Sequence, residues 1–143
     1  MVMGWEDEHP HRFFIKGTYY GEPGLSPSGL EIVDEESVRL SEVVTDEGDK
    51  FVYQYGSGIG WSHEILIKKI LAPKPWHRYP FCLEGKRACP PEHFPGPWEY
   101  REFLKALKNP SRAGNTNRKG LVVEDFHPEK FDQELVHRRL GWS

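Results

Sequence analysis

The 143-residue sequence has no long hydrophobic run, few cysteines and no strong excess of charge of either sign. No stretch approaches the roughly 20 apolar residues that a membrane span requires, and residues 1–14 carry acids where a signal peptide has basic and apolar regions. We therefore expect a soluble, cytoplasmic protein with no membrane partner. The net charge of −3 gives no overall positive field, so nucleic-acid binding would need a local basic patch.

Cysteine is scarce, with two residues in the chain. Cytoplasmic thiols stay reduced by default, so we expect free thiols or metal ligands before a disulfide. No catalytic motif stands out. Ser62 and His63 are adjacent, and neighbours on a regular strand point to opposite faces, so they do not form a nucleophile pair. We predict no catalytic residue and favour a protein that is not an enzyme.

Aromatic residues, in contrast, are abundant at 13% of the chain. A chain of this length buries roughly 68–70% of the surface that it exposes when unfolded, which suits one domain. We predict a single α+β domain over residues 1–143, with a mainly antiparallel sheet packed by two or three helices. Most of the aromatic side chains are expected in its core.

The first half of the chain predicts most of the sheet. Residues 11–20 are rich in aromatic and β-branched residues and predict one strand. Turn formers and acids follow, so 21–36 is expected to be a long surface loop. Residues 37–44 carry apolar side chains close to helical spacing and predict a short helix. FVYQY (51–55) and WSHEILIKKIL (61–71) predict two further strands.

The stretch GSGIG, at 56–60, connects those two strands, and its three glycines allow the positive φ angles that a tight hairpin turn needs. Along the second strand alternate residues share a face. His63 therefore shares a face with the apolar residues Trp61, Ile65 and Ile67. We expect His63 to be buried and hydrogen-bonded, because a buried unpaired imidazole costs on the order of 1–3 kcal/mol.

The second half is marked by proline, with seven of the 12 prolines between positions 73 and 97. Each fixes φ and lacks an N–H, so we expect an extended, semi-rigid connector there. Pro97 at a first helical position, followed by an apolar stripe, predicts a helix over 97–108. After a loop at 109–120, a second helix is expected from Pro128 to Leu140, ended by Gly141.

The order of these segments resembles that of a known family. The matching stretches are MGWEDEHPHRFFIKG, FVYQYGSGIGWSHEILIKKIL, RYPFCLEGKRACPPEHFPGPWEYREFLKAL and EDFHPEKFDQELVHRRL. Together they cover nearly the whole chain and resemble the Ri-plasmid open-reading-frame-three-like family, whose members are also labelled insertion-element passenger or resolvase-like proteins. The resemblance implies an α+β fold. It implies little about activity, because the family is largely uncharacterised and its mobile-element label describes genomic company.

Two internal departures from the family pattern bear on chemistry. Where the family tends to read YxYDFGDDWxHE, this chain has Gly56, Ile59 and Gly60 at positions where acids are common. Any role of those carboxylates in metal or acid–base chemistry is therefore not carried over. Where the family often has a third cysteine, after PPED, this chain has His93 and Phe94.

A third departure concerns the start of the chain. The family usually has an additional strand and helix before the segment that resembles MGWEDEH. If that strand pairs with residues 11–20 in the relatives, this chain leaves a hydrogen-bonding edge and an apolar face open. We therefore expect a homo-oligomer, most simply a two-fold dimer, in which the neighbour's sheet edge or the segment around Trp5 covers the gap.

Cys82 and Cys89 are separated by LEGKRA, which predicts a turn that brings the two thiols close together. With His93, and with His63 or His77 as a fourth donor, they are candidate ligands, and zinc is the metal that such a closed site holds. Two other interpretations stay open. The thiols are packing residues, since free cysteine is often buried, or they form a reversible disulfide.

Arg112, Arg118 and Lys119 form a basic stretch without acids, and basic loops contact phosphates. They are the candidate nucleic-acid contacts, with a solvated loop as the alternative. Three further histidines are expected at the surface and not as ligands: His9, His11 and His137.

Three functions follow from these features. The first is a non-catalytic binding or interaction module of a mobile-element-associated family, whose connector is structural or holds a metal. The second is a nucleic-acid-handling accessory of mobile elements, and the third is a metal-dependent enzyme. Exposed tryptophans would favour the second over the first, because a surface on which bases stack must be open to solvent.

Overall fold

The computed structural model describes residues 2–24, 29–58, 60–108 and 126–141. Its contacts divide the chain into two compact units. The first, here called the sheet unit, comprises Asp7–His77. The second, called the helical unit, comprises Met1–Glu6 and Arg78–Ser143, and each unit is described by itself. The single domain expected over residues 1–143 stays a prediction.

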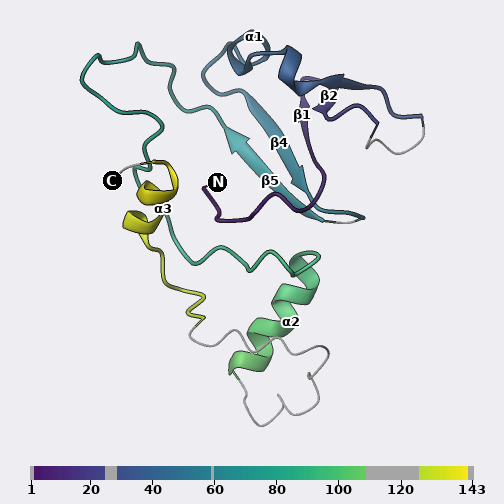
Figure 1. Cartoon of the computed structure of the whole chain (residues 1–143), viewed down its shortest axis with the longest axis vertical. Helices are drawn as coiled ribbons and strands as arrows, with labels where there is room; N and C mark the ends of the chain where they lie inside the picture. The colour runs from purple at the N-terminus through teal and green to yellow at the C-terminus, as the bar shows by residue number, and fades with distance from the viewer. Residues whose placement is uncertain (1, 25–28, 59, 109–125, 142–143) are drawn as a thin grey trace. The chain divides into compact units, whose positions relative to one another are not determined.

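The sheet unit is built on a five-stranded sheet in the order β3-β2-β1-β4-β5 (Figure 1). The strands are β1 (His11–Ile15), β2 (Thr18–Gly21), β3 (Ile32–Asp34), β4 (Lys50–Tyr55) and β5 (Trp61–Leu66). β2 and β3 pair in parallel, and the other pairs are antiparallel. The prediction of an α+β fold with a mainly antiparallel sheet is confirmed.

The single strand predicted over 11–20 is wrong, because the chain reverses at Lys16 and Gly17. Their φ angles are 47° and 86°, which suits the two-residue turn that joins twisted hairpin strands. Lys16 Nζ lies 2.8 Å from Asp49 Oδ2 at the start of β4, and this hydrogen bond lowers the pKa of Asp49 and raises that of Lys16. β1 consequently lies between β2 and β4. The oligomer prediction assumed that this part of the chain forms an open sheet edge, and that assumption is wrong because β1 has a neighbour on both sides.

The surface loop predicted over 21–36 contains β3 and the 3-10 turn η1 (Glu35–Ser37), so that prediction is wrong in its second half. Asp34 caps η1 by accepting the backbone N–H of Glu36 at 3.0 Å. The short helix predicted over 37–44 is present as α1 (Leu40–Val43). The hairpin of β4 and β5 is confirmed, although β5 ends at Leu66.

The core of the sheet unit is centred on Ile15, Val44 and Phe51. Half-buried apolar side chains pack against them: Phe13, Tyr20, Val43, Ile65 and Ile67. Along β5 half-buried and exposed residues alternate as predicted, so the predicted register is confirmed. His63 is half-buried rather than fully buried, and its Nδ1 lies 3.3 Å from the backbone oxygen of Tyr53.

The helical unit contains α2 (Pro97–Lys108), which has the predicted bounds. Phe94 packs on Phe103 of α2 with ring centroids 4.9 Å apart, and Phe103 packs on Phe126 at 5.8 Å. The buried Trp5 donates its indole N–H to the backbone oxygen of Pro90 at 2.8 Å. These aromatic contacts give the helical unit a core of its own.

The last helix, α3 (Gln133–Arg139), begins later than the predicted Pro128. Asp132 is its N-cap and accepts the backbone N–H of Leu135 at 2.8 Å, so the cap lies after Pro128 and not before it. Gly141 follows with a φ of 80°, as expected of the residue that ends a helix. Within the described ranges, no helix combines the length and apolar character needed to cross a bilayer.

Candidate functional site

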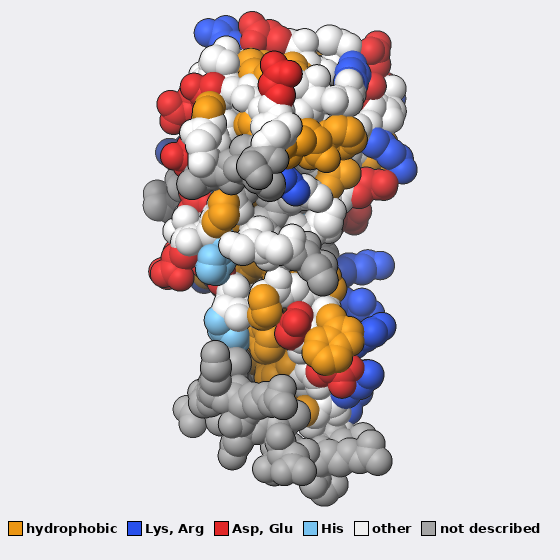
Figure 2. Space-filling view, turned by 90° about the vertical axis from the view of Figure 1, so that its right-hand side faces the viewer, with side chains coloured by type: hydrophobic (Ala, Val, Ile, Leu, Met, Phe, Trp, Pro, Cys, Tyr) orange, Lys and Arg blue, Asp and Glu red, His pale blue; other side chains and the backbone are white. Residues whose placement is uncertain are grey.

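The predicted proline-rich connector contains neither helix nor strand before Pro97. Within and just before it, every residue from Lys68 to Phe81 is exposed, and we call these 14 residues the exposed segment. Large apolar side chains that proteins usually bury stand open along it: Ile70, Leu71, Trp76, Tyr79 and Phe81. Figure 2 shows one face of the molecule, on which hydrophobic side chains reach the surface between charged ones.

Trp76 stands at the tip of a turn within the exposed segment. The backbone N–H of His77 donates to the oxygen of Lys74 at 3.0 Å and closes a four-residue turn. Pro75 takes the second position of this turn, where its fixed φ is favoured. The turn holds Trp76 with 82% of its surface exposed, the largest exposed fraction of any large hydrophobic side chain in the described residues.

Both ends of the exposed segment are tied to folded elements. At the first end, Glu47 accepts a hydrogen bond from Lys69 Nζ at 3.2 Å and from the backbone N–H of Ile70 at 3.0 Å. At the other end, Phe81 stacks on His137 of α3, with ring centroids 4.5 Å apart. These contacts lie within the sheet unit and within the helical unit, respectively. Each end of the exposed segment is therefore attached to a folded element of its own unit.

The exposed segment is also basic. It contains Lys68, Lys69, Lys74 and Arg78, and no Asp or Glu occurs between Glu64 and Glu84. Four positive charges and no negative charge give a local charge of +4, against −3 for the whole chain. This basic patch was not predicted from the sequence. The run without acids would have revealed it, as it revealed the stretch around Arg112.

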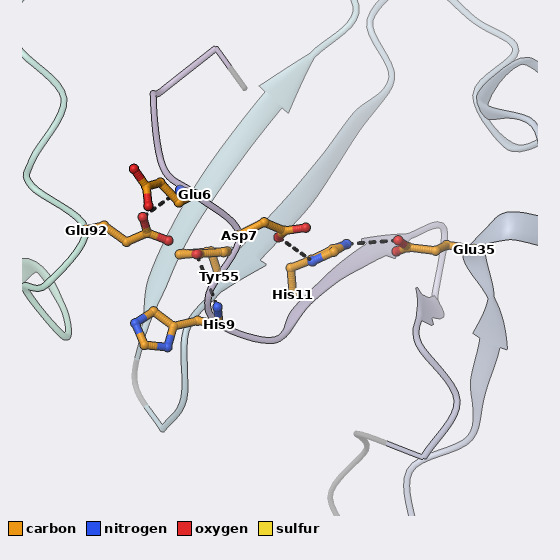
Figure 3. Close-up of polar contacts among 7 residues, drawn as sticks. All are labelled: Glu6, Asp7, His9, His11, Glu35, Tyr55 and Glu92. Atoms are coloured by element: carbon orange, nitrogen blue, oxygen red, sulfur yellow. Dashed lines mark hydrogen bonds and ion pairs between the residues drawn. The ribbon is translucent and has the colours of Figure 1, made fainter.

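A second candidate is a polar cluster around His11 in the sheet unit (Figure 3). His11 Nδ1 lies 3.3 Å from Asp7 Oδ1, and His11 Nε2 lies 2.8 Å from Glu35 Oε1. The His11 ring also lies 5.9 Å from that of Tyr53 on the neighbouring β4. The prediction of a surface position for His11 is therefore wrong, because the side chain is half-buried and paired with two carboxylates.

This cluster joins β1 to η1, but its histidine has no ring nitrogen that is open to a ligand. Both ring nitrogens of His11 face a carboxylate, so neither is open to a metal or a substrate unless a carboxylate leaves. Glu35 Oε2 is buried and has no hydrogen-bond partner among the described residues. Figure 3 also shows the backbone N–H of Glu6 donating to Glu92 Oε2 at 2.6 Å in the helical unit.

The two cysteines carry free, half-buried thiols in the helical unit. Cys82 Sγ lies 3.6 Å from the backbone oxygen of Glu84, and Cys82 O accepts hydrogen bonds from Gln133 and His137 at 2.8 and 3.0 Å. Burial raises the pKa of the Cys89 thiol to about 11, so this group is protonated at neutral pH. A protonated thiol is a weak metal ligand, because the thiolate is the binding form.

The predicted zinc ligands are distributed over both units. Cys82, Cys89 and His93 belong to the helical unit and His63 to the sheet unit. Among the described residues, no three or more His, Cys, Asp or Glu side chains are grouped so as to hold a metal ion. His93 is exposed and packs its ring on Phe94 at 4.5 Å. The zinc site stays a prediction.

The predicted nucleic-acid contacts Arg112, Arg118 and Lys119 lie outside the described residues. The expectation that the aromatics are core residues is correct for Trp5 and Tyr55, which are buried. It is wrong for Trp76 and Trp98, whose side chains are exposed by 82% and 63%. Proline around Trp76 explains the exposed position of that side chain, because a segment without backbone pairing cannot turn its side chains into a shared core.

The protein thus has an α+β fold, and its exposed segment carries basic and aromatic side chains outside the helices and strands. The sequence matches the family described as plasmid pRiA4b ORF-3-like protein over residues 1–135, and the chain belongs to this family. The resemblance noted from the sequence is confirmed. The family is one of uncharacterised proteins, so membership assigns no activity.

Two relatives have comparable sequence or structure. The uncharacterized protein y4hQ of Sinorhizobium fredii is 37% identical over 111 residues, which cover 77% of this chain and 56% of the relative. The chain thus spans about half the length of this curated relative. A crystal structure of a protein of unknown function from Methanosarcina mazei Go1 is similar with a TM-score of 0.79 and 34% identity, covering 93% of this chain and 75% of that chain.

Proposed function

We propose that the protein is a non-catalytic binding module whose exposed segment, Lys68–Phe81, contacts a partner. The observation that carries this proposal is the uninterrupted exposure of 14 residues that include Trp76. Tryptophan and tyrosine are enriched among the residues that dominate binding energy, and both occur here without intramolecular burial. Water-exposed apolar surface of this kind marks an interaction site more often than a random surface.

The geometry favours binding in a second way. The turn at Pro75, closed by the hydrogen bond from the backbone N–H of His77 to the oxygen of Lys74, orders the middle of the exposed segment around Trp76. Ordering a segment before it meets its partner reduces the conformational entropy lost on binding. The metal-dependent enzyme considered from the sequence gains no support from the His11 cluster, since both ring nitrogens already contact carboxylates.

Photo-crosslinking tests the proposal without knowledge of the partner. Trp76 is replaced by photoreactive benzoylphenylalanine, and the protein is irradiated in an extract of its host cells. The matched control carries the same group at Trp98, which is also exposed but lies on α2. We expect a discrete adduct at position 76 that is absent at position 98. Equal labelling at both positions, or none at 76, contradicts the proposal.

We further propose that this module works in the cytoplasm. Cys82 and Cys89 are free thiols, the form that the reducing cytoplasm maintains. Fractionation of host cells with an antibody to the protein tests this location, and recovery in the periplasmic or secreted fraction would contradict it.

A further inference from the structure

We infer that the exposed segment binds single-stranded nucleic acid, with phosphates contacted by its basic side chains and a base stacked on Trp76. This inference rests on the proposed function and names the partner class. It places nucleic-acid contacts at Lys68–Phe81, apart from the basic stretch that includes Arg112. The carrying observations are the local charge, the geometry of the turn and the absence of regular structure.

The charge of the exposed segment is complementary to a phosphate backbone. Lys68, Lys69, Lys74 and Arg78 are all exposed, and Lys69 also donates a hydrogen bond to Glu47 at 3.2 Å. These cations follow one another along the chain with no acid among them, so a strand that carries one phosphate per nucleotide can contact several of them. Because the whole chain has a net charge of −3, the electrostatic attraction for an anion is confined to the exposed segment.

The aromatic side chains supply the second half of the recognition. Trp76 projects from a hydrogen-bonded turn with 82% of its surface exposed, and Tyr79 follows three residues later at 59%. A base stacks on such rings whatever its identity, because every base has a π face. Lys74 precedes Trp76 by two positions, and Arg78 lies between Trp76 and Tyr79 in the sequence. A strand can therefore contact cations and rings at the same time.

Single-stranded nucleic acid fits these features better than a duplex or a protein surface. Reading duplex DNA takes a helix or a β-ribbon that enters the major groove, and the exposed segment is neither. Stacking requires bases that are not already stacked inside a duplex. Lysine is depleted at protein–protein interfaces, yet three of the 14 residues here are lysines. The combination of lysine with tryptophan thus favours an unpaired nucleic-acid strand.

Fluorescence anisotropy with the purified full chain and a labelled oligothymidine of about 20 nucleotides tests the inference. At about 50 mM salt we expect saturable binding, and three phosphate contacts predict a slope of log K against log salt of about −2. Trp76→Ala should weaken binding on the order of 5- to 100-fold, the effect of losing one stacked base. The double variant Lys74→Glu, Arg78→Glu should bind weaker still and lose most of the salt dependence.

Matched controls separate these effects from general damage. Trp98→Ala removes an exposed tryptophan outside the exposed segment, and Lys130→Glu changes the charge of an exposed lysine there. Both should bind like the unaltered chain. No binding at low salt, or equal loss in Trp98→Ala and Trp76→Ala, overturns the inference. Equal affinity for the duplex of the same strand overturns the single-strand assignment.

The photo-crosslinking experiment distinguishes failure of the nucleic-acid inference from failure of the proposed binding function. An adduct at position 76 that nuclease removes supports the nucleic-acid partner. An adduct that resists nuclease and is digested by protease supports a binding module and overturns its nucleic-acid ligand. The absence of any specific adduct, together with absent oligonucleotide binding, overturns both.

Discussion

The ring of His137 lies on that of Phe81, with centroids 4.5 Å apart and planes at 26°, while its Nε2 lies 3.0 Å from the backbone oxygen of Cys82. One side chain of α3 thus holds two consecutive residues of an irregular segment. The contact fixes the place where the exposed segment ends and the helical unit begins.

Removing this side chain should loosen that end of the segment. His137→Ala loses the hydrogen bond to Cys82 and the stacking on Phe81, so we expect the free energy of unfolding to fall by about 1–2 kcal/mol in urea titration. Arg138→Ala, which alters the exposed neighbouring residue, should change it by less than about 0.5 kcal/mol. Identical values for the two variants would show that the His137 contact contributes nothing.

The two thiols should differ in reactivity. Partial burial raises the pKa of Cys89 to about 11, and at about pH 8 such a thiol has on the order of a hundredfold less thiolate than a thiol of ordinary pKa. Iodoacetamide should therefore modify Cys82 well before Cys89, as peptide mass spectrometry over time can show. Equal rates for the native protein would contradict the burial of Cys89. Both thiols should react alike after unfolding in urea.

The same burial makes stability depend on alkaline pH. The folded-state pKa of Cys89 lies above its unfolded value of 9.0, at about 11, so the unfolded chain loses its proton first as the pH rises. The contribution of this thiol is intact below about pH 9 and is lost as the pH rises toward about 11. Cys89→Ala should flatten the fall of unfolding free energy in that window, whereas Cys82→Ala should leave its slope unchanged.

The glycines between β4 and β5 should tolerate side chains unequally. A Cβ on Gly60, whose φ is 51°, would lie 2.6 Å from the backbone oxygen of Tyr55, whereas a Cβ on Gly58, at a φ of 68°, would meet nothing within 4 Å. We expect Gly58→Ala to cost about 1 kcal/mol and Gly60→Ala clearly more than about 2 kcal/mol by thermal or urea unfolding. Equal costs would mean that the turn relaxes without penalty.

The edge of β5 suggests how a dimer forms. Ile67 exchanges backbone hydrogen bonds on the β4 side, with Asp49 and Gly48, so Ser62 and Glu64 direct their backbone groups away from β4. Two copies of β5 can pair antiparallel with Ser62 opposite Glu64 and His63 on the two-fold axis. The alternative register places Glu64 opposite itself, and like charges in that position destabilise a sheet. We therefore expect a two-fold dimer in the first register.

Light scattering at micromolar concentration tests this dimer. Glu64→Pro removes an outward N–H and should give a monomer, because proline is tolerated on an edge but cannot donate to a new neighbour. Glu64→Gln keeps the N–H and should remain dimeric. A monomer of 16.6 kDa for the unaltered chain would contradict the prediction.

The sequence predicted those elements whose signals are local. α2 has its predicted bounds because Pro97 and the apolar stripe both act within one helix. The reversal at Lys16 was missed because a lysine gives no sign that it adopts a positive φ, a conformation that the paired strands impose. β3 was missed because three residues in an acidic stretch become a strand only when β2 lies alongside.

The candidate site was predicted less well than the fold. The prolines did indicate an extended connector. The exposure of Trp76 could not be predicted in the same way, because it depends on which side chains pack into the core of the folded protein. His11 was misjudged for a related reason. Its partners Asp7 and Glu35 are four and 24 positions away, and only the packing of η1 beside β1 brings the second one within 2.8 Å.

The exposed segment has two attachments, Glu47 at one end and His137 at the other, and no regular pairing between them. A protease that cleaves after Arg78 would meet an exposed backbone there, because the nearby prolines keep it out of helices and sheets. One such cut would not by itself divide the protein, because Met1–Glu6 belong to the helical unit and Trp5 donates a hydrogen bond to Pro90. The surface offered for binding is therefore a position at which the chain can be cut while its two fragments stay associated.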